Sequence, residues 1–317
     1  MRTNHKYKRF HLGVALVMII SLASCNQNQN QQNAEGGETV EITHTMETIE
    51  APVNPERFVV LDYSILENLD ALGLKPVGVP KLAMPHFLED YKNDQSIQDI
   101  GTIAEVNLER INELQPQVIF SGGRLQEQYA DIKRIAPTVQ PANDGSRPFE
   151  SLKTNLDYIG KIFNKQEETD KLYQDLMDRA NDVKAQAAEQ NLSALVIMHN
   201  KGKFSAYGKG SRFGIIHDFV GIGEAVEGLS THRHGNVVSS EYILQANPDV
   251  LFVIDRNTAI ASGSPLDKSF VENALVKQTN AFKNGKIIYL DSQAWYLAGG
   301  GVKSINIMLD EIEQAFD

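Results

Sequence analysis

Three arginines follow segments that are strand-like or rich in glycine. They are Arg124 in SGGR, Arg212 in GKGSR and Arg256 in VIDR. A guanidinium group is planar, permanently charged and weakly hydrated, so it suits delocalised oxygen anions at a desolvated site. A single arginine is most often a solvated surface charge, whereas three in such positions indicate an anion-binding site.

Two other segments carry side chains that are suited to iron(III). A loop contains His232-Arg233-His234, and Trp295-Tyr296 precedes a run of three glycines. A phenolate oxygen and an imidazole nitrogen can complete the coordination sphere of iron(III) when a ligand leaves positions open. The alternative is an exposed histidine pair and an aromatic cluster of the core, and neither segment is specific by itself.

The sequence carries no motif of a common enzyme class. It contains no GxSxG, HExxH, CxxC or GxGxxG segment and no recognisable set of nucleophile, base and orienting group. The glycines 299–301 differ from a phosphate-binding loop and favour a tight turn into a C-terminal helix, 304–316. His217 falls in a helical pattern and is expected to be packed. We therefore expect a binding protein rather than an enzyme.

A helix–strand pattern occurs twice along the chain. Residues 107–120 (NLERINELQPQVIF) match residues 239–252 (SSEYILQANPDVLF), and the same offset aligns Arg124 with Arg256. Each copy has a polar N-cap candidate, a short helical pattern, a proline and an apolar run suited to a buried parallel strand. Because ligands of open α/β sheets bind outside the carboxyl ends of the strands, we expect the two arginines to face each other across a cleft.

The remaining pattern predicts an α/β fold with two pseudo-symmetric lobes. Strand-like runs occur at 58–61, 77–79, 195–198 and 286–290. No glycine or proline interrupts residues 161–201, and apolar residues there recur at steps of three and four, which indicates an amphipathic helix. We expect an N-terminal lobe (38–147), a long helical spine (148–191) and a C-terminal lobe (192–317).

Composition and charge limit the classes of partner. The chain has 317 residues and a formal net charge of −11, which argues against nucleic acid as a partner. Its long-range field repels anions, so an anionic ligand needs a local cluster of positive charge. A single cysteine excludes a disulfide framework and a cysteine-based zinc cluster.

The first 24 residues have the pattern of a secretory signal peptide. Basic residues precede an apolar run at 12–23, which is shorter than the roughly 20 residues that a membrane span needs. The run ends in LASC and is similar to a bacterial lipobox, whose cysteine, here Cys25, is lipidated. Residues 25–37 are rich in Asn and Gln and are expected to form a flexible tether. We expect a lipid-anchored protein on the extracytoplasmic face of the membrane, at the cell surface or in the periplasm.

Several motifs together resemble the ferric-siderophore-binding lipoproteins of bacterial ABC importers, and among them the catecholate-binding group that includes petrobactin binders. They are the lipobox cysteine, SGGR, GSRFGIIHD, HGNVVSSEYI, NPDVLFVIDR and QAWYLAGGG. The resemblance covers nearly the whole mature chain. It implies the helical-backbone periplasmic binding protein fold with a shallow cleft, and a monomer without an intrinsic cofactor. It also implies two partners, a ferric catecholate siderophore and a dimeric ABC permease with its ATPase.

The resemblance also assigns residues to the site. It implies that the three arginines neutralise the chelate, and that His234 and Tyr296 bind its iron when a tetradentate siderophore leaves two positions free. The family reads Thr-His-Gly where this chain reads THRHG; the spacing from Glu241 selects His234, with His232 as the alternative. Some relatives carry a second basic residue just after the first arginine, where this chain has LQE.

Glu109 and Glu241 occupy matching positions in the first turns of the repeated helices. The helix dipole stabilises a carboxylate there by about 0.3–1 kcal/mol, which is a sufficient structural reason for either residue. The resemblance implies instead that each lobe offers one glutamate to arginines of the permease, because surface ion pairs steer association and fix register.

Three rival functions remain open at the level of sequence. The first is a haem or cobalamin receptor of the same fold, and the second is a siderophore esterase. The third is a free-metal binder that uses histidines, namely His86, His199, His232 and His234.

Overall fold

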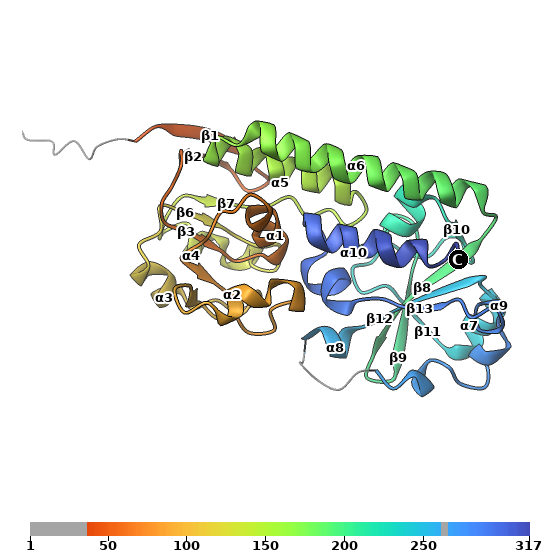
Figure 1. Ribbon diagram of the computed structural model, residues 1–317. Coiled ribbons are helices and arrows are strands. Elements are labelled where there is room, and N and C mark those ends of the chain that lie inside the picture. The colour runs from red at the N-terminus through yellow and green to blue at the C-terminus, as the bar shows by residue number, and fades with distance from the viewer. Residues whose placement is uncertain (1–36, 261–265) are drawn as a thin grey trace, which may run out of the picture. The chain divides into compact units, whose positions relative to one another are not determined.

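The structure of the chain is a computed structural model that describes residues 37–260 and 266–317. The predicted signal peptide, Cys25 and all of the tether except Gly37 lie outside the described residues. Within the described ranges, no helix is both long and apolar enough to cross a membrane. These residues form a sheet of five strands, a sheet of six strands and a two-stranded hairpin, with helices packed around them (Figure 1).

The N-terminal half contains a parallel sheet with the strand order β5-β4-β3-β6-β7. All residues of β3 and β6 are buried, as is usual for parallel strands that helices cover on both faces. The antiparallel hairpin β1–β2 precedes this sheet and has no counterpart in the sequence-based expectations. The elements are β1 (Thr39–Thr43), β2 (Thr48–Pro52), β3 (Phe58–Val60), α1 (Tyr63–Ala71), β4 (Gly78–Val79), α2 (Glu89–Asn93), β5 (Gln98–Asp99), α3 (Leu108–Glu113), β6 (Val118–Phe120), α4 (Tyr129–Ile132) and β7 (Thr138–Val139).

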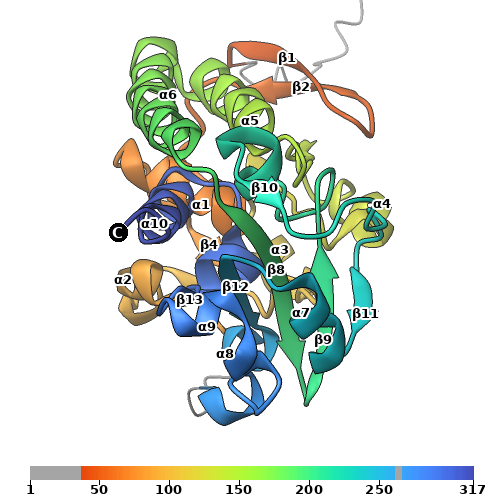
Figure 2. The ribbon, with the colours of Figure 1, turned by 90° about the vertical axis from the view of Figure 1, so that its right-hand side faces the viewer.

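The C-terminal half contains a mixed sheet with the order β11-β9-β8-β12-β13, and β10 pairs with β8. Strands β8, β12 and β13 are parallel, while β9 and β11 are antiparallel to their neighbours. Helices α7 and α9 cover one face, and α6 and α10 the other (Figure 2). The elements are β8 (Ser193–Asn200), β9 (Lys203–Tyr207), β10 (Gly223–Glu224), β11 (Asn236–Val238), α7 (Ser240–Ala246), β12 (Val250–Asp255), α8 (Arg256–Ile260), α9 (Asn280–Lys283), β13 (Ile287–Tyr289) and α10 (Val302–Glu313), with π-helical turns at 215–220 and 293–298.

The two copies of the sequence repeat fold alike, as α3 followed by β6 and α7 followed by β12. The side chain of Asn107 accepts a hydrogen bond from the backbone N–H of Arg110, and that of Ser239 from Tyr242. Both residues are therefore N-caps, as their sequence positions predict. The α/β fold class is confirmed.

The segment between the halves holds two helices rather than one. Helix α5 (Pro148–Phe163) ends at Asn164, which has a left-handed backbone (φ 51°), and α6 (Gln166–Glu189) packs against it. Helix α5 contacts α1 and β1, whereas α6 contacts α10. The amphipathic pattern is confirmed for α6, whose buried residues include Leu176, Ala180, Val183 and Ala187.

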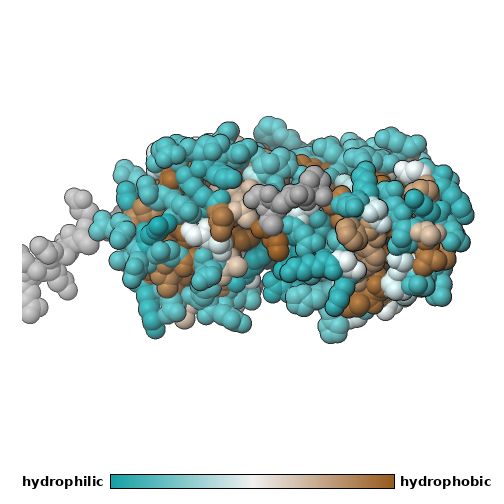
Figure 3. Space-filling model, turned by 90° about the horizontal axis from the view of Figure 1, so that it is seen from below, coloured by the Kyte–Doolittle hydropathy of each residue, from teal (hydrophilic) through white to brown (hydrophobic). Residues whose placement is uncertain are grey.

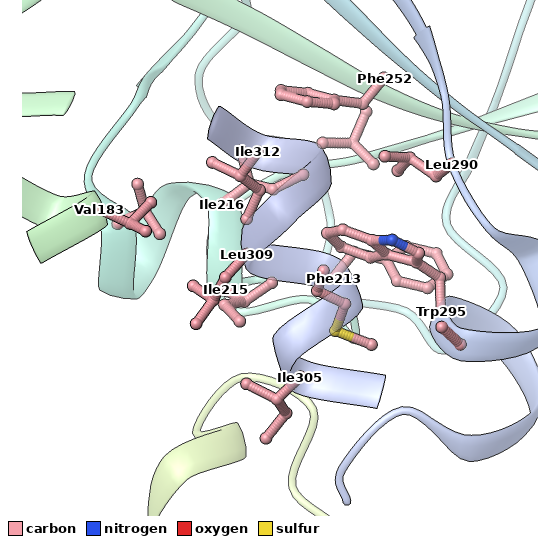
Figure 4. Close-up of a cluster of buried hydrophobic side chains, with 14 of the residues drawn as sticks. Val183, Phe213, Ile215, Ile216, Phe252, Leu290, Trp295, Ile305, Leu309 and Ile312 are labelled. Atoms are coloured by element: carbon pink, nitrogen blue, oxygen red, sulfur yellow. The ribbon is translucent and has the colours of Figure 1, made fainter. Parts of the chain in front are cut away.

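A large apolar cluster packs α10 against the mixed sheet (Figure 4). Ile305, Leu309 and Ile312 recur at steps of four and three, so they share one face of α10, and all three are fully buried. Fully burying a side chain of this size contributes roughly 1.5–3 kcal/mol. Trp295 belongs to the same cluster, and its indole Nε1 donates a hydrogen bond of 2.6 Å to Glu311 of α10. The position of Tyr296 therefore depends on the packing of its neighbour.

Helix α10 begins against α1 of the other half. The backbone N–H of Ser304 donates to Glu67 Oε2 over 2.6 Å, and that of Val302 to Asn68 Oδ1 over 3.1 Å. A Cβ atom at Gly301 would collide with the Glu67 side chain, so glycine is required for this approach. The predicted turn at the glycine run is confirmed, and the helix starts two residues earlier than its sequence suggests because these side chains cap it.

Candidate functional site

Tyr296 lies at the centre of the three predicted arginines. The guanidinium carbons of Arg124, Arg212 and Arg256 are 5.6, 4.6 and 5.7 Å from the centroid of its ring. Arg256 Nε donates a hydrogen bond of 2.9 Å to the phenol oxygen. Arg124 Nη2 and Arg212 Nη2 donate to the main-chain carbonyl of Tyr296 over 2.6 and 3.3 Å. One residue thus brings together cations from both halves of the chain.

Strand ends and helix starts position these side chains. Arg124 lies in the turn after β6, and Arg256 is the first residue of α8, directly after β12. Asp255 caps α8, since its Oδ2 accepts from the N–H and hydroxyl of Thr258 over 3.1 and 2.5 Å. Tyr296 belongs to the π-helical turn 293–298, a rare conformation that is frequent at functional sites.

A buried histidine supports Asp255 from the neighbouring strand. His199 of β8 is paired in register with Asp255 of β12, and its Nδ1 lies 2.9 Å from Asp255 Oδ1. The N–H of Gly202 donates to His199 Nε2, so the imidazole proton is on Nδ1 and is donated to the carboxylate. Burial opposes ionisation of Asp255, but hydrogen bonds from Thr258 and His199 outweigh it and hold the pKa of this carboxyl below its usual value.

The cluster of cations changes the acidity of the phenol. Burial of Tyr296 opposes its ionisation, but the hydrogen bond from Arg256 and the charges of the three arginines outweigh it, so the pKa of Tyr296 is lowered. Burial also lowers the pKa of Arg212, and the nearby charge of Arg124 adds to this effect. The arrangement shifts Tyr296 toward its phenolate form. It also concentrates positive charge that an anion would neutralise.

A cavity of about 290 Å³ lies beside this cluster, with residues of both halves in its wall. Seen from below, the surface is hollowed where the two halves meet (Figure 3). The described residues of the wall include no aspartate or glutamate. They are Gly123, Arg124, Gln126, Asn143, Gly145, Arg212, Arg233, Trp295, Tyr296, Leu297, Ala298 and Gly299.

The loop with the two histidines contributes an arginine to this wall. Among the described lining residues is Arg233, whereas His232 and His234 are exposed and are not part of the wall. Arg233 is not among the residues predicted from the sequence, because it does not follow a strand-like or glycine-rich segment as the other three arginines do. Gly235 closes the loop with φ 69°.

The other predicted residues lie apart from the cavity. Glu109 and Glu241 are both exposed, in the first turns of α3 and α7. His86 is exposed, and its Nδ1 lies 3.0 Å from Gln293 Oε1. His217 is packed as expected, and burial lowers its pKa.

The free-metal alternative gains no support from the geometry. In the parts of the chain that the structure describes, no group of three or more His, Cys, Asp or Glu side chains could hold a metal ion.

A family model described as periplasmic binding protein matches residues 58–294. This chain belongs to the periplasmic binding protein family. The petrobactin-binding protein YclQ of Bacillus subtilis is 38% identical to this periplasmic binding protein over 96% of the chain and 98% of its own length. The ferric-anguibactin-binding protein FatB of Vibrio anguillarum is 35% identical over 96% of the chain and 98% of its own length.

Solved structures agree with this family assignment. The crystal structure of YclQ matches this periplasmic binding protein with a TM-score of 0.85, covering 88% of this chain and 99% of that one. The siderophore-binding protein BauB, solved with two acinetobactin molecules and ferric iron, matches with a TM-score of 0.82 and 34% identity, covering 88% of this chain and 99% of its own. These names describe binding proteins, which confirms the prediction of a receptor rather than an enzyme.

Proposed function

We propose that this protein is an extracytoplasmic receptor that binds an anionic ferric catecholate siderophore between its two halves and delivers it to an ABC permease for iron uptake. The observation that carries the proposal is the convergence of three guanidinium groups on Tyr296, whose pKa they lower. The names of YclQ, FatB and BauB, all of which bind siderophores, support the ligand class.

The chemistry of the site suits an iron chelate with open positions. Phenolate oxygen is a hard donor that iron(III) accepts, and the guanidinium groups offset the negative charge of the catecholate oxygens. We assign Tyr296 to one open position of a tetradentate chelate. We assign His234 to the other, with His232 as the alternative, because both lie on an exposed loop next to Arg233 of the cavity wall.

The receptor also needs an anchor and a docking face. We propose that acyl chains on Cys25 hold the protein at the membrane, since two or more chains give stable anchoring. We further propose that Glu109 and Glu241, one exposed glutamate on each half, contact the two subunits of the permease.

Fluorescence titration tests the ligand assignment. Trp295 is the only tryptophan of the chain and directly precedes Tyr296. The iron(III) complex of a synthetic bis-catecholamide should therefore quench its emission strongly, while cobalamin and zinc should have little effect. Absence of quenching by the chelate would contradict the proposal, and quenching by haem alone would favour the haem receptor.

Absorption spectra of the bound complex test direct coordination. Tyr296→Phe and His234→Ala should each remove the change in the iron charge-transfer band that accompanies binding, and His232→Ala should keep it. Unchanged bands in Tyr296→Phe and His234→Ala would exclude both residues as iron ligands. Loss of the change in His232→Ala alone would transfer the assignment to His232.

A further inference from the structure

We propose that Tyr207 is a further ligand-binding residue, whose hydroxyl donates a hydrogen bond to an anionic oxygen of the bound chelate. The inference rests on the proposed function, because it needs an anionic ligand between the two halves. It assigns Tyr207 a role as a hydrogen-bond donor, which differs from the role of Tyr296 as an iron ligand.

The hydroxyl of Tyr207 is buried without a partner. Tyr207 is the last residue of β9, its ring packs edge-on against Phe213 with centroids 4.8 Å apart, and only 1% of its surface is exposed. No group within residues 37–260 and 266–317 forms a hydrogen bond with this hydroxyl. Buried hydroxyls are usually paired because an unpaired one loses its bonds to water without replacement.

The groups around this hydroxyl explain why the chain supplies no acceptor. The charges of Arg212 and Arg256 and the phenol of Tyr296 all act on Tyr207. Guanidinium groups only donate hydrogen bonds, and the phenol oxygen of Tyr296 accepts a hydrogen bond from Arg256 but none from Tyr207. An incoming anion with several oxygens would provide the missing acceptor at the same cluster of cations.

The pKa values of the two tyrosines are shifted in opposite directions. Burial raises the pKa of Tyr207 to about 12, although the charge of Arg212 opposes the shift, whereas the pKa of Tyr296 is lowered. Tyr207 therefore keeps its proton at neutral pH and can donate it in a hydrogen bond. Tyr296 is the more acidic of the two phenols.

The histidine loop lies directly on the hydroxyl end of this ring. A Cβ atom at Gly235 would be 2.7 Å from Tyr207 Cζ, the carbon that bears the hydroxyl. Residues 231–234 are exposed. The N–H of Gly235 donates to the carbonyl of His232, and Asn236 exchanges hydrogen bonds with the main chain of Ser230 at the base of the loop. A ligand that binds His234 therefore contacts the loop that covers Tyr207. Movement of this loop would expose the hydroxyl of Tyr207 to the ligand.

Tyr207→Phe tests the assignment, because it removes only the hydroxyl and keeps the ring that packs on Phe213. With the iron(III) bis-catecholamide as probe, we expect affinity to fall about tenfold, the loss typical of a hydrogen bond to a charged acceptor. The charge-transfer band of the bound complex should be unchanged, since Tyr207 is not an iron ligand. Thermal stability of the ligand-free variant should be unchanged or higher, because an unpaired hydroxyl is lost.

Tyr129→Phe is the matched control. The hydroxyl of Tyr129 is bonded to Glu47 and to the carbonyl of Thr138, away from the cavity. Its removal should lower thermal stability and leave the affinity for the chelate unchanged. This is the behaviour expected of a hydroxyl with a purely structural role.

The outcomes separate this inference from the proposed function. Equal affinities of wild type and Tyr207→Phe would overturn the role of Tyr207 alone. A loss of stability in Tyr207→Phe with unchanged affinity would do the same and would make its hydroxyl structural. Failure of the wild-type protein to bind the chelate would overturn the proposed function and this inference with it.

Discussion

The phenol of Tyr296 accepts a hydrogen bond of 2.9 Å from Arg256, and three guanidinium groups lie 4.6–5.7 Å from the centre of its ring. Charges so close together stabilise a phenolate more than a phenol, because each cation interacts with the negative form. Arg124 and Arg212 also donate to main-chain carbonyls, which holds their side chains in place. Hydrogen bonds within the chain therefore position the three arginines around Tyr296.

Replacement of one arginine should raise the pKa of Tyr296. Arg256→Gln removes a full charge next to the phenol oxygen, so the ionisation of Tyr296 should move to higher pH by about one unit or more. Alkaline titration of tyrosinate absorbance measures the shift, with Tyr296→Phe to identify the signal among ten tyrosines. Arg134→Gln, at an exposed position with a local partner only, is the control. An unshifted titration would mean that Arg256 does not control the phenol.

Helix α10 supports the cavity wall by holding the side chain of Trp295, which belongs to that wall. Glu67 and Asn68 of α1 cap its N-terminus, and Glu311 on its side holds the indole of Trp295. Glu67 is fully buried, and Glu311 is partly buried. Burial raises the pKa of Glu67 to about 8 and that of Glu311 to about 7. The helix that supports the site is therefore sensitive to pH.

The contribution of Glu67 to the stability of the protein should fall as pH rises from about 4.5 to about 8, because unfolded Glu67 ionises at about 4.5 and folded Glu67 only near 8. One such group contributes a slope of about 1.4 kcal/mol per pH unit within that interval. Glu67→Gln should remove its share of the slope in denaturant unfolding measured across this range. Glu311→Gln serves as the comparison, since its share should end near pH 7. Parallel curves for wild type and Glu67→Gln would refute the raised pKa.

In the whole molecule, side chains from one half reach the main chain of the other. Arg124 donates to the carbonyls of Tyr296 and Leu297 over 2.6 and 3.3 Å. Glu109 and Glu241 lie on different halves, and Val237, which is 82% exposed, lines the same groove as Glu241. An exposed apolar residue beside an exposed carboxylate suits a docking surface with an apolar centre and a charged rim.

Reversal of charge at both glutamates should separate binding from transport. The double variant Glu109→Lys/Glu241→Lys should bind the iron(III) bis-catecholamide as the wild type does, because neither residue lines the cavity described above. Iron uptake by cells that carry the permease should fall at least tenfold, since like charges would then meet at the interface. Glu189→Lys, at the exposed end of α6, should leave uptake unchanged. Normal uptake by the double variant would exclude docking through these glutamates.

The amino-acid sequence by itself determined the local elements and the positions at which the arginines follow them. Near neighbours along the chain determine three kinds of feature, which composition and periodicity therefore predict. They are the capping by Asn107 and Ser239, the apolar face of α6 and the burial of strands β6 and β12. Strand β5 consists of two exposed polar residues, and β7 consists of Thr138 and Val139 directly after a proline, so neither has the apolar run that predicts β4. The break of the spine at Asn164 also escaped prediction, because an asparagine in the left-handed region leaves no periodic signal.

Only the tertiary structure decided which side chains meet at the site. Arg124 reaches carbonyls 172 and 173 residues further along the chain, Arg233 joins the cavity wall in place of the neighbouring histidines, and Tyr207 is left among donors without an acceptor. Such contacts depend on how whole elements pack, and a side chain's direction on an irregular loop follows from that packing rather than from its own sequence. The physical reason is that propensities act over a few residues, whereas burial and charge act between residues that are distant along the chain.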